Sequence, residues 1–332
     1  MGECQGKETP VIGRFRGPYG FLSNFYPAKL TYDGLTYCNA EAAYQAQKCR
    51  DPRQREAFSR LYGDEAKHRG RQVAVRPDWE EEKVAVMAGV LAAKFGQNPH
   101  LARWLAETGE IPLREGNPWG DTFWGVDQRT GEGENHLGRL LMALRAGYRQ
   151  TGLPTGPLCP EARFRAPDGL VLTDREITQM ETDCIVHGSD RTLCREDWTF
   201  ALAGGPALEA ACQGLGGCAP GEARLTPGYD LPAAFVLHTA EPVYGREAEA
   251  LLGQCYTACL DLARARGFSR IVFPPLGTGK ACFPKAKAAC IAVEAVRGWL
   301  AAHRDCGLAV EFSCTDQRSY DCVRAALAGE TL

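Results

Sequence analysis

Four polar side chains that could do chemistry recur at helical spacing in the segment EAAYQAQK, residues 41–48. They are Glu41, Tyr44, Gln45 and Lys48, at positions i, i+3, i+4 and i+7. This spacing places all four on one face of a helix, while alanines occupy the other face. Two interpretations stay open. In the first, which spacing alone favours, the face is exposed to solvent and its polar side chains form a ladder of contacts along the helix. In the second, the face is a pocket wall where a carboxylate and an amine converge on a ligand.

A second segment whose residues could bind a ligand is IVFPPLGTGKACFP, residues 271–284. It has the pattern of an apolar strand, a Gly-Thr-Gly turn and a proline that opens a helix. Backbone N–H groups of such a turn form a concave anion site, to which the dipole of the following helix adds. Because glycine turns between strands and helices are common, the surrounding sequence has to decide whether this turn binds phosphate.

The elements that position the first segment are mainly helical. Asn39 can cap a helix through residues 41–48, with Glu41 in its first turn. The capping-box pattern Asp78-Trp79-Glu80-Glu81 opens a second helix, and periodic leucines mark a third. The apolar stripes of these two helices are formed by Val84, Met87, Leu91 and Phe95 and by Leu137, Leu140, Leu141 and Leu144.

The second segment lies among short apolar strands that alternate with helices. Strands are predicted at 184–186, 234–238, 271–273 and 308–313, and helices near 247–266, 284–302 and 316–328. This alternation is typical of a sheet covered on both faces. The stretch 150–169, with four prolines and three glycines, is typical of a linker. We therefore predict domains at 1–149 and 170–332, a linker at 150–169, and an α/β fold overall.

Bulk composition is that of an ordinary globular protein, with 45% hydrophobic and 24% charged residues. No apolar run approaches the roughly 18–20 residues of a membrane-spanning helix, and the polar N-terminus lacks the apolar region of a signal peptide. We expect a cytoplasmic protein without membrane contact. The net charge of −3 supplies no overall field for nucleic acid, although residues 1–150 carry a slight excess of Lys and Arg that suits phosphate-bearing substrates.

The 15 cysteines are spaced irregularly and include no C-x-x-C pair. Several lie inside apolar runs, as Cys184, Cys290 and Cys314 do, and are expected to be reduced thiols. Cys255 and Cys259 are one helical turn apart, but no nearby histidine or second pair accompanies them. We therefore predict no metal site and no cofactor.

Seven blocks of the first half, in order over residues 12–148, resemble the NADAR, or YbiA-like, family of N-glycosidases. They are FLSNFYP (21–27), EAAYQAQK (41–48), AK…GR (66–71), DWEEEKVAVM (78–87), KF (94–95), DTFWGVD (121–127) and GENHLGRLLM (133–142). The resemblance implies a mainly helical α+β domain. Some family members resemble enzymes that cleave ribosylamine intermediates of riboflavin synthesis, and others remove ADP-ribose from guanine bases of nucleic acid.

Cleavage of a C1–N bond of ribose builds oxocarbenium-like charge at C1, so a carboxylate must stabilise it or activate water. Glu41 is the first candidate for this role and Asp121 the second. With an exocyclic leaving nitrogen the sugar can open, and Lys48 could then form a Schiff base, although a lysine beside a carboxylate is more often an ion pair. The resemblance implies substrate-binding roles for Ser23, Asn24, Phe25, Tyr44, Gln45, Lys67, Arg71, Trp124 and Asn135.

These binding residues also have simpler interpretations. Phe25 and Trp124 offer flat faces for a base, but each is also a typical core residue. Asn135 could simply cap the helix that carries Leu137. Positive side chains such as those of Lys67 and Arg71 meet phosphates or stay solvated at the surface.

The second half resembles the macrodomain family, which binds ADP-ribose, across about 150 residues. The resemblance is carried by residues 205–244 and by the strand, turn and helix of 271–284. It implies a three-layer α/β domain in which Gly277, Thr278, Gly279 and Phe283 form the diphosphate-binding loop. It also places Phe312 near the adenine and matches Glu176, followed by Ile177, to the adenine-binding aspartate of the family.

The loop that hydrolytic macrodomains use for catalysis is altered here. Those proteins carry an Asn-Ala-Ala-Asn stretch and then a glycine-rich loop, whereas residues 187–206 have the sequence HGSDRTLCREDWTFALAGGP. His187 and Asp190 replace the asparagines and could form a new acid–base pair, although a histidine at a strand end is more often only hydrogen-bonded. Because the glycines that allow close backbone approach are replaced, we expect binding rather than hydrolysis in this half.

Two halves that both resemble ADP-ribose-handling families favour a hydrolase that removes ADP-ribose from nucleobases of DNA or RNA. The first half would carry the reaction, and the second would help to recognise ADP-ribose. Such a protein would reverse the action of an ADP-ribosyltransferase toxin, its expected partner. Two alternatives stay open: a glycosidase of ribosylamine phosphates in riboflavin synthesis, and a non-catalytic reader of ADP-ribose or NAD-derived metabolites.

Overall fold

The computed structural model describes residues 10–155, 161–193 and 198–330. The chain divides into two compact units, residues 1–159 and 160–332, each with its own buried core. The division falls inside the predicted linker. Helix α6 (His136–Thr151) reaches into that segment from one side, and strand β5 (Arg163–Arg165) lies within it as part of the second unit.

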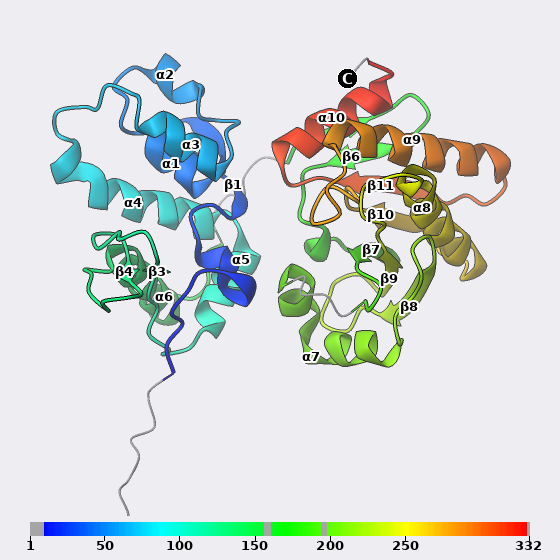
Figure 1. Cartoon of the computed structure of the whole chain (residues 1–332), viewed down its shortest axis with the longest axis horizontal. Helices are drawn as coiled ribbons and strands as arrows, with labels where there is room; N and C mark the ends of the chain where they lie inside the picture. Colours follow the sequence, from blue (N-terminus) through cyan, green and yellow to red (C-terminus); the bar gives the residue numbers. More distant parts are fainter. Residues whose placement is uncertain (1–9, 156–160, 194–197, 331–332) are drawn as a thin grey trace, which may run out of the picture. The chain divides into compact units, whose positions relative to one another are not determined.

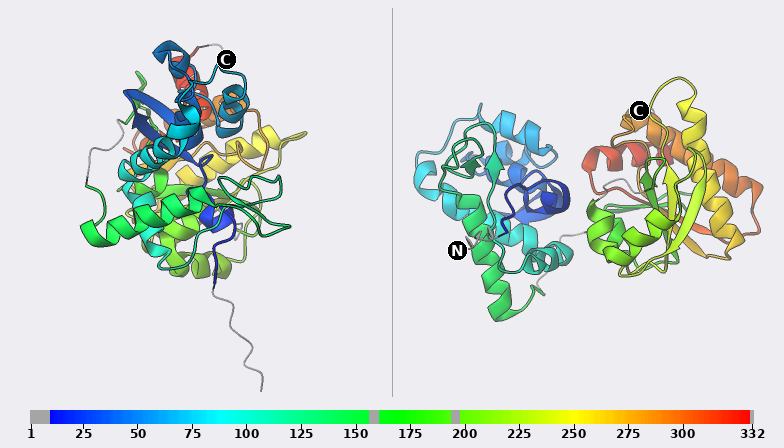
Figure 2. Two further views of the ribbon diagram at one scale, coloured as in Figure 1. Left: turned by 90° about the vertical axis from the view of Figure 1, so that its left-hand side faces the viewer. Right: turned by 60° about the horizontal axis from the view of Figure 1, so that its bottom comes forward.

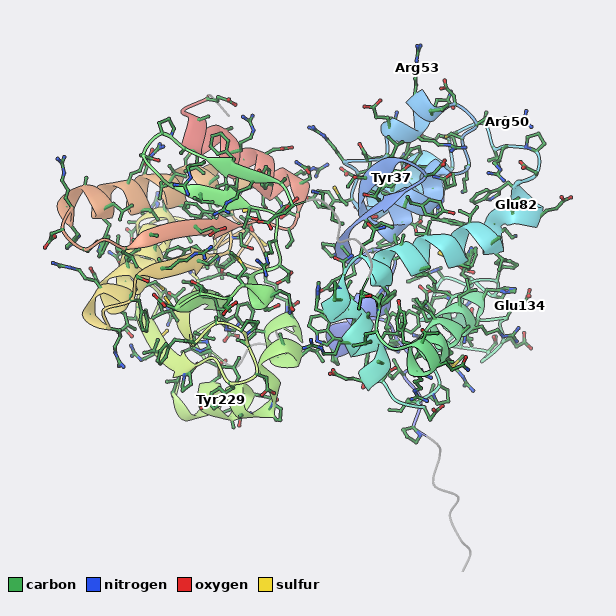
Figure 3. The ribbon with its side chains drawn as sticks, turned by 180° about the vertical axis from the view of Figure 1, so that it is seen from behind. Tyr37, Arg50, Arg53, Glu82, Glu134 and Tyr229 are labelled. Carbon is green, nitrogen blue, oxygen red and sulfur yellow. The ribbon has the colours of Figure 1, made fainter. Side chains whose placement is uncertain are left out.

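The first unit opens with a 3-10 helix, η1 (Gly17–Leu22), and a hairpin of β1 (Pro27–Tyr32) and β2 (Leu35–Asn39). Asp33 and Gly34 join the strands with φ angles of 49° and 77°, the left-handed values of a two-residue hairpin turn. Strand β2 leads directly into α1 (Ala40–Ala46), so the hairpin fixes where α1 begins (Figure 1). Tyr37 of β2 is fully buried inside this unit (Figure 3).

The other elements of the first unit confirm its mainly helical α+β character. The helices are α2 (Pro52–Glu56), α3 (Gly63–Gly70), α4 (Trp79–Gly96), α5 (Pro99–Glu107) and α6, with β3 (Gly116–Asn117) paired in parallel with β4 (Val126–Asp127). Helix α4 buries Met87, Leu91 and Phe95 of its predicted stripe. It begins at Trp79 as predicted, but Asp78 makes no capping bond to the helix, and its Oδ1 accepts from Arg76 Nε at 2.8 Å instead.

The second unit is built on a sheet whose seven described strands follow the order β5-β6-β11-β10-β7-β9-β8. The inner strands run parallel: β6 (Val171–Thr173), β7 (Cys184–Ser189), β9 (Phe235–Ala240), β10 (Arg270–Phe273) and β11 (Ala309–Ser313). The edge strands β5 and β8 (Ala223–Pro227) are antiparallel to their neighbours. The carboxyl ends of the parallel strands therefore lie along one side of the sheet.

Helices cover both faces of this sheet, which confirms the predicted three-layer architecture (Figures 1 and 2). One face packs against α8 (Ala248–Ala265), α9 (Lys285–Ala302) and α10 (Gln317–Ala328). The other packs against α7 (Trp198–Gly214) and the 3-10 helix η2 (Ile177–Gln179). Cys184 and Val186 of β7 enter the first layer and Ile185 the second, as the two-residue period of a strand requires.

None of the helices in the described ranges combines the length and apolar character needed to cross a membrane. The cysteines that the structure describes are free thiols, and Cys184, Cys255, Cys259 and Cys314 among them are buried. Over the same residues, no group of three or more His, Cys, Asp or Glu side chains is arranged to hold a metal ion.

Candidate functional site

A cavity of about 860 Å³ lies in the first unit and gathers most of the residues predicted to act there. Its walls come from the loop after η1, from α1 and α3, and from the stretch around β3 and β4. Its size suits a nucleotide-sized ligand. The predicted residues that line it are Ser23, Asn24, Phe25, Glu41, Tyr44, Gln45, Lys67, Arg71, Asp121 and Trp124.

Helix α1 forms one wall of the cavity and decides between the two interpretations of its polar face. All seven residues of α1 are buried, including Glu41, Tyr44 and Gln45. Asn39 caps the helix as predicted, because its Oδ1 accepts from Ala42 N at 2.8 Å. The polar face is therefore a pocket wall and not a solvent-exposed ladder.

The Glu41 carboxyl is 6% exposed and accepts a hydrogen bond from Gln45 Nε2 at 2.9 Å. Burial raises the pKa of this carboxyl above its usual range, and the Gln45 bond and the Lys67 charge oppose that rise. Gly70 of α3 lies against this pair, and a Cβ at position 70 would overlap Gln45 Oε1. Glu41 and Gln45 thus keep their arrangement because residue 70 has no side chain.

Glu115 is a second carboxyl of the cavity and was not predicted from the sequence. Burial, together with the neighbouring Asp121 and Glu41 carboxylates, raises its pKa to about 7. It lies in the irregular stretch between α5 and β3, where no periodicity marks it. A carboxyl that titrates near neutrality beside a second carboxyl is suited to general acid–base catalysis.

Asp121 lies on the loop between β3 and β4. Hydrogen bonds to backbone N–H groups and to the side-chain amide of Asn117 hold it there. Its Oδ1 accepts from Phe123 N at 3.2 Å and from Trp124 N at 2.9 Å. The Asn117 side chain binds the Asp121 backbone at both ends, since Nδ2 donates to the carbonyl and Oδ1 accepts from the N–H. These bonds fix Asp121 in the cavity wall, where its charge acts on Glu115.

A buried lysine holds the loop that carries Ser23, Asn24 and Phe25. Lys94 of α4 is 0% exposed, and its Nζ donates to Phe21 O at 2.6 Å and Ser23 O at 2.7 Å. Burial lowers the pKa of Lys94 to about 7. Lys94 is therefore a positioning residue that fixes the backbone of a loop lining the cavity.

Aromatic rings and cations meet at the exposed side of the cavity. Phe25 is 42% and Trp119 is 56% exposed, and Lys67 Nζ lies 5.8 Å from the centroid of each ring. Arg71 and His68 line the same cavity. Flat exposed rings suit the stacking of a base, and the cations suit phosphate groups. Trp119 was not predicted, because it stands alone in a loop without periodicity.

Two buried acceptors in the cavity wall have no hydrogen-bond partner within the described protein. They are Asn24 Oδ1 and Gln45 Oε1, on residues that are 7% and 6% exposed. A buried acceptor without a partner costs roughly 1–3 kcal/mol. The wall therefore offers two acceptors to a ligand that brings N–H or O–H donors, such as a base edge or ribose hydroxyls.

Lys48 does not lie where the helical spacing placed it. Helix α1 ends at Ala46, so Lys48 lies beyond the helix and outside the cavity lining. Its Nζ donates to Gly70 O at 3.3 Å and lies 5.9 Å from the Trp79 ring centroid. Among the first-unit lysines that the structure describes, Lys67 is the one that lines the cavity.

Asn135 is outside the residues that line the cavity, and although it directly precedes α6, its side chain makes no capping bond to that helix. Its φ is 53°, and its side chain points to the segment before β3. Its Nδ2 donates to Leu113 O at 2.8 Å, and its Oδ1 accepts from Glu115 N at 3.1 Å. Asn135 is therefore a positioning residue for the backbone of Glu115.

The Gly-Thr-Gly turn of the second unit follows β10 at the carboxyl ends of the parallel strands, the side at which open α/β sheets bind ligands. Gly277 has a φ of 82°, and its N–H donates to Glu241 Oε1 at 3.0 Å. Thr278 Oγ1 donates to Pro275 O at 2.8 Å, and Gly279 is exposed. Glu176 directly precedes η2 and caps it, because its Oε1 accepts from Thr178 N at 3.5 Å.

Three residues that the resemblance assigns to ADP-ribose binding in the second unit have side chains that belong to its core. Ile177, Phe283 and Phe312 are 6%, 3% and 0% exposed. Phe312 lies on β11 with its ring centroid 6.3 Å from that of Phe273 and 6.5 Å from that of Tyr256. Its ring therefore packs between the sheet and the helices and does not face an adenine. The position of Phe312 in the sequence did not show on which side of the sheet its ring lies.

His187 and Asp190, considered above as an acid–base pair, each have local partners. His187 Nδ1 lies 3.1 Å from His238 Nδ1, and the His187 ring stacks on Phe200 with centroids 4.4 Å apart. Asp190 Oδ1 accepts from Thr192 N at 2.9 Å and from Thr192 Oγ1 at 2.6 Å. Each of the two side chains therefore has at least one local partner.

A helical unit with a carboxyl-lined cavity and a three-layer unit with a glycine turn at its ligand-binding side define a two-domain α/β protein. Residues 13–149 match the model of the NADAR domain, and residues 197–292 match that of the Macro domain. The chain belongs to the macro domain family and carries a NADAR domain ahead of the macro domain. The two resemblances seen in the sequence are confirmed.

Individual relatives match the second unit. A macro domain-containing protein of Chlorobaculum tepidum is 39% identical over 170 residues, which cover 49% of this chain and 98% of that protein. ADP-ribose glycohydrolase MACROD2 of Mus musculus is 35% identical over 150 residues, 43% of this chain but 31% of the mouse protein. The Oceanobacillus iheyensis macrodomain with MES bound superposes with a TM-score of 0.47 and 28% identity, over 51% of this chain and 95% of that chain.

Proposed function

We propose that the first unit hydrolyses the N-glycosidic bond between ADP-ribose and a nucleobase of DNA or RNA. The observation that carries this proposal is the pair of carboxyls with raised pKa values, Glu41 and Glu115, in one cavity. The membership of both units in families that include hydrolases of ADP-ribose and glycosidic bonds supports the same reaction class.

In this mechanism the C1–N bond breaks and a water oxygen takes its place at C1. Positive charge develops at C1 as the base departs, and the Glu41 carboxylate stabilises this charge and accepts a proton from the attacking water. Glu115, with a pKa of about 7, carries a proton in the neutral range and gives it to the leaving nitrogen. The products are free ADP-ribose and the unmodified base.

The other cavity residues would bind the two ends of this substrate. Trp119 and Phe25 offer stacking faces to the base, and Lys67 and Arg71 offer charge to the diphosphate. The open acceptors of Asn24 and Gln45 suit ribose hydroxyls or base N–H groups. A substrate that is both aromatic and anionic satisfies all of these groups.

If the ribose ring opens during the reaction, its aldehyde would meet Lys67 rather than Lys48, because Lys67 lines the cavity. The lysine amine and the aldehyde would condense to an imine with loss of water. Borohydride reduction followed by peptide mapping checks this assignment. We expect any trapped sugar on Lys67, and a sugar trapped on Lys48 would contradict the geometry.

In the same proposal, the second unit helps to recognise ADP-ribose and the whole protein reverses an ADP-ribosyltransferase toxin in the cytoplasm. The pairing of two units from ADP-ribose-related families supports this role. Co-expression with a nucleobase-modifying ADP-ribosyltransferase tests it. We expect the wild-type chain to restore growth and the E41Q chain to fail, whereas equal rescue by both would contradict the antitoxin role.

The decisive experiment offers three substrates to the full chain in parallel. They are guanine-ADP-ribosylated DNA or RNA, ADP-ribosylated protein, and a ribosylamine phosphate. We expect free ADP-ribose to be released from the nucleic acid alone. Turnover of the ribosylamine phosphate alone would favour the riboflavin alternative, and binding of ADP-ribose without any turnover would favour the reader.

A further inference from the structure

The Gly-Thr-Gly turn of the second unit is expected to bind a diphosphate through its backbone N–H groups, yet several of these groups already have partners. Gly277 N donates to Glu241 Oε1 at 3.0 Å. Leu276 N donates to Pro274 O at 2.9 Å and to Tyr256 Oη at 3.1 Å. Thr278 N donates to Pro275 O at 3.4 Å. The start of the turn is therefore satisfied by the chain itself.

Of these partners, Glu241 is the one that resembles a ligand. A carboxylate oxygen is an anionic acceptor, as a phosphate oxygen is, and it binds a turn N–H at ordinary hydrogen-bond length. One N–H cannot make the same bond to Glu241 and to an incoming phosphate. The two anions would also repel each other at close range.

Glu241 is built into this position. It directly follows β9, and its N–H donates to Ser189 O at the end of β7 at 2.8 Å. Its carboxylate lies against Gly188, since a Cβ at position 188 would overlap Glu241 Oε1. The carboxylate therefore reaches the turn across the carboxyl ends of adjacent strands, through space that a larger residue at position 188 would fill.

We propose that Glu241 is an internal anion of the second unit that determines its ligand specificity by excluding diphosphates from the Gly277 turn. A ligand such as ADP-ribose enters only when the Glu241 side chain leaves Gly277 N. This inference bears on one part of the proposed function, the recognition of ADP-ribose by the second unit, which then requires Glu241 to leave Gly277 N. It is independent of the glycosidase reaction of the first unit.

The test is hydrogen–deuterium exchange of residues 276–284 in the full chain, titrated with ADP-ribose. The proteins are the wild type, Glu241→Gly, Glu241→Gln and the matched control Glu294→Gln, whose exposed side chain lies on α9. We expect ADP-ribose to slow exchange of this segment in Glu241→Gly at concentrations roughly tenfold or more below those needed in the wild type and the control. Glu241→Gln, which keeps the size but loses the charge, is expected to fall between them.

Two outcomes would overturn the proposal. One is protection of residues 276–284 in the wild type over the same ADP-ribose range as in Glu241→Gly. The other is no protection in either Glu241 variant while exchange of β7 and β10 shows that both are folded. Because exchange is measured locally, ADP-ribose bound in the first unit does not enter the result. Failure of the glycosidase assay also leaves this test intact.

Discussion

The two units treat their polar groups in opposite ways. In the first, Asn24 Oδ1 and Gln45 Oε1 are buried acceptors without partners in the described protein, and two neighbouring carboxyls have raised pKa values. In the second, the turn expected to bind phosphate donates to Glu241 and to its own backbone. The difference shows that two segments typical of ligand-binding families can occur in one chain although one has buried acceptors available to a ligand and the other begins with N–H groups that the chain itself satisfies.

Among the substitutions that test whether the cavity of the first unit is catalytic, Glu115→Gln is expected to lower turnover the most. Glutamine cannot donate an acidic proton, so turnover should fall by roughly 10²–10⁴-fold, the usual contribution of general acid–base catalysis. In the wild type, turnover should decline as pH rises through about 7, because Glu115 then loses its proton. A pH profile of kcat/KM for both proteins measures the two effects.

Two controls accompany that profile. Glu82→Gln changes a carboxyl that extends from the start of α4 into solvent (Figure 3) and should leave turnover unchanged. Lys94 also has a pKa of about 7, so a decline above neutrality that persists in Glu115→Gln would assign the titration to Lys94 and not to Glu115.

The next largest effect is expected for Gly70→Ala. The added Cβ would overlap Gln45 Oε1 and displace the side chain that binds Glu41. A displacement of about 1 Å near reacting groups can cost on the order of 10²-fold in rate. Turnover should fall while the melting temperature changes little, and Gly147→Ala, on α6 with open space around a Cβ, is the matched control. Wild-type turnover in Gly70→Ala would show that the Glu41–Gln45 arrangement does not matter.

A smaller effect is expected for Trp119→Ala at the cavity mouth. Loss of base stacking costs roughly 1–3 kcal/mol, which corresponds to about 5–150-fold. The loss should appear in KM with little change in kcat, because Trp119 is exposed and is not assigned to the proton transfers. Steady-state kinetics on an ADP-ribosylated oligonucleotide measure both constants, and an unchanged KM would remove Trp119 from the binding surface.

The smallest expected effect is a change with pH in the free energy of unfolding of the first unit, caused by the titration of Lys94. Its folded-state pKa is lowered to about 7, so the folded state releases this proton at lower pH than the unfolded state does. The first unit should therefore become more stable as pH rises from 8 to 9, on the order of 1 kcal/mol, a range above the pKa of about 7 of Glu115, whose titration has the opposite effect on stability. Urea unfolding followed by tryptophan fluorescence measures this, and Lys94→Met should lose the pH dependence. An equal dependence in that variant would assign it to other groups.

Helical periodicity predicted which side chains share one helix face, but not that this face is a pocket wall, because spacing alone favours a solvent-exposed face. The spacing of Glu41, Tyr44 and Gln45 and the cap at Asn39 are local properties, and the structure confirms their shared face. The same periodicity failed at Lys48, because nothing in residues 41–48 marks the end of α1 at Ala46. A helical pattern fixes which side chains share a face but gives the end of the helix poorly.

The remaining features depend on contacts between distant segments and could not be predicted. Glu115 enters the cavity because Asn135 binds its backbone, and those residues are 20 positions apart. Glu241 meets Gly277 only because strand order brings the ends of β7, β9 and β10 together. Strand order follows from tertiary packing, which a strand's own sequence does not reveal.

The most direct test of the central claim, that the first unit carries the reaction, is release of ADP-ribose from a guanine-ADP-ribosylated oligonucleotide by full-length Glu41→Gln. Single-turnover release is measured beside the wild type and Glu82→Gln, with ADP-ribose binding measured by calorimetry. We predict that Glu41→Gln binds ADP-ribose but releases none from the oligonucleotide, while both other proteins release it. Release by Glu41→Gln at the wild-type rate would contradict the account.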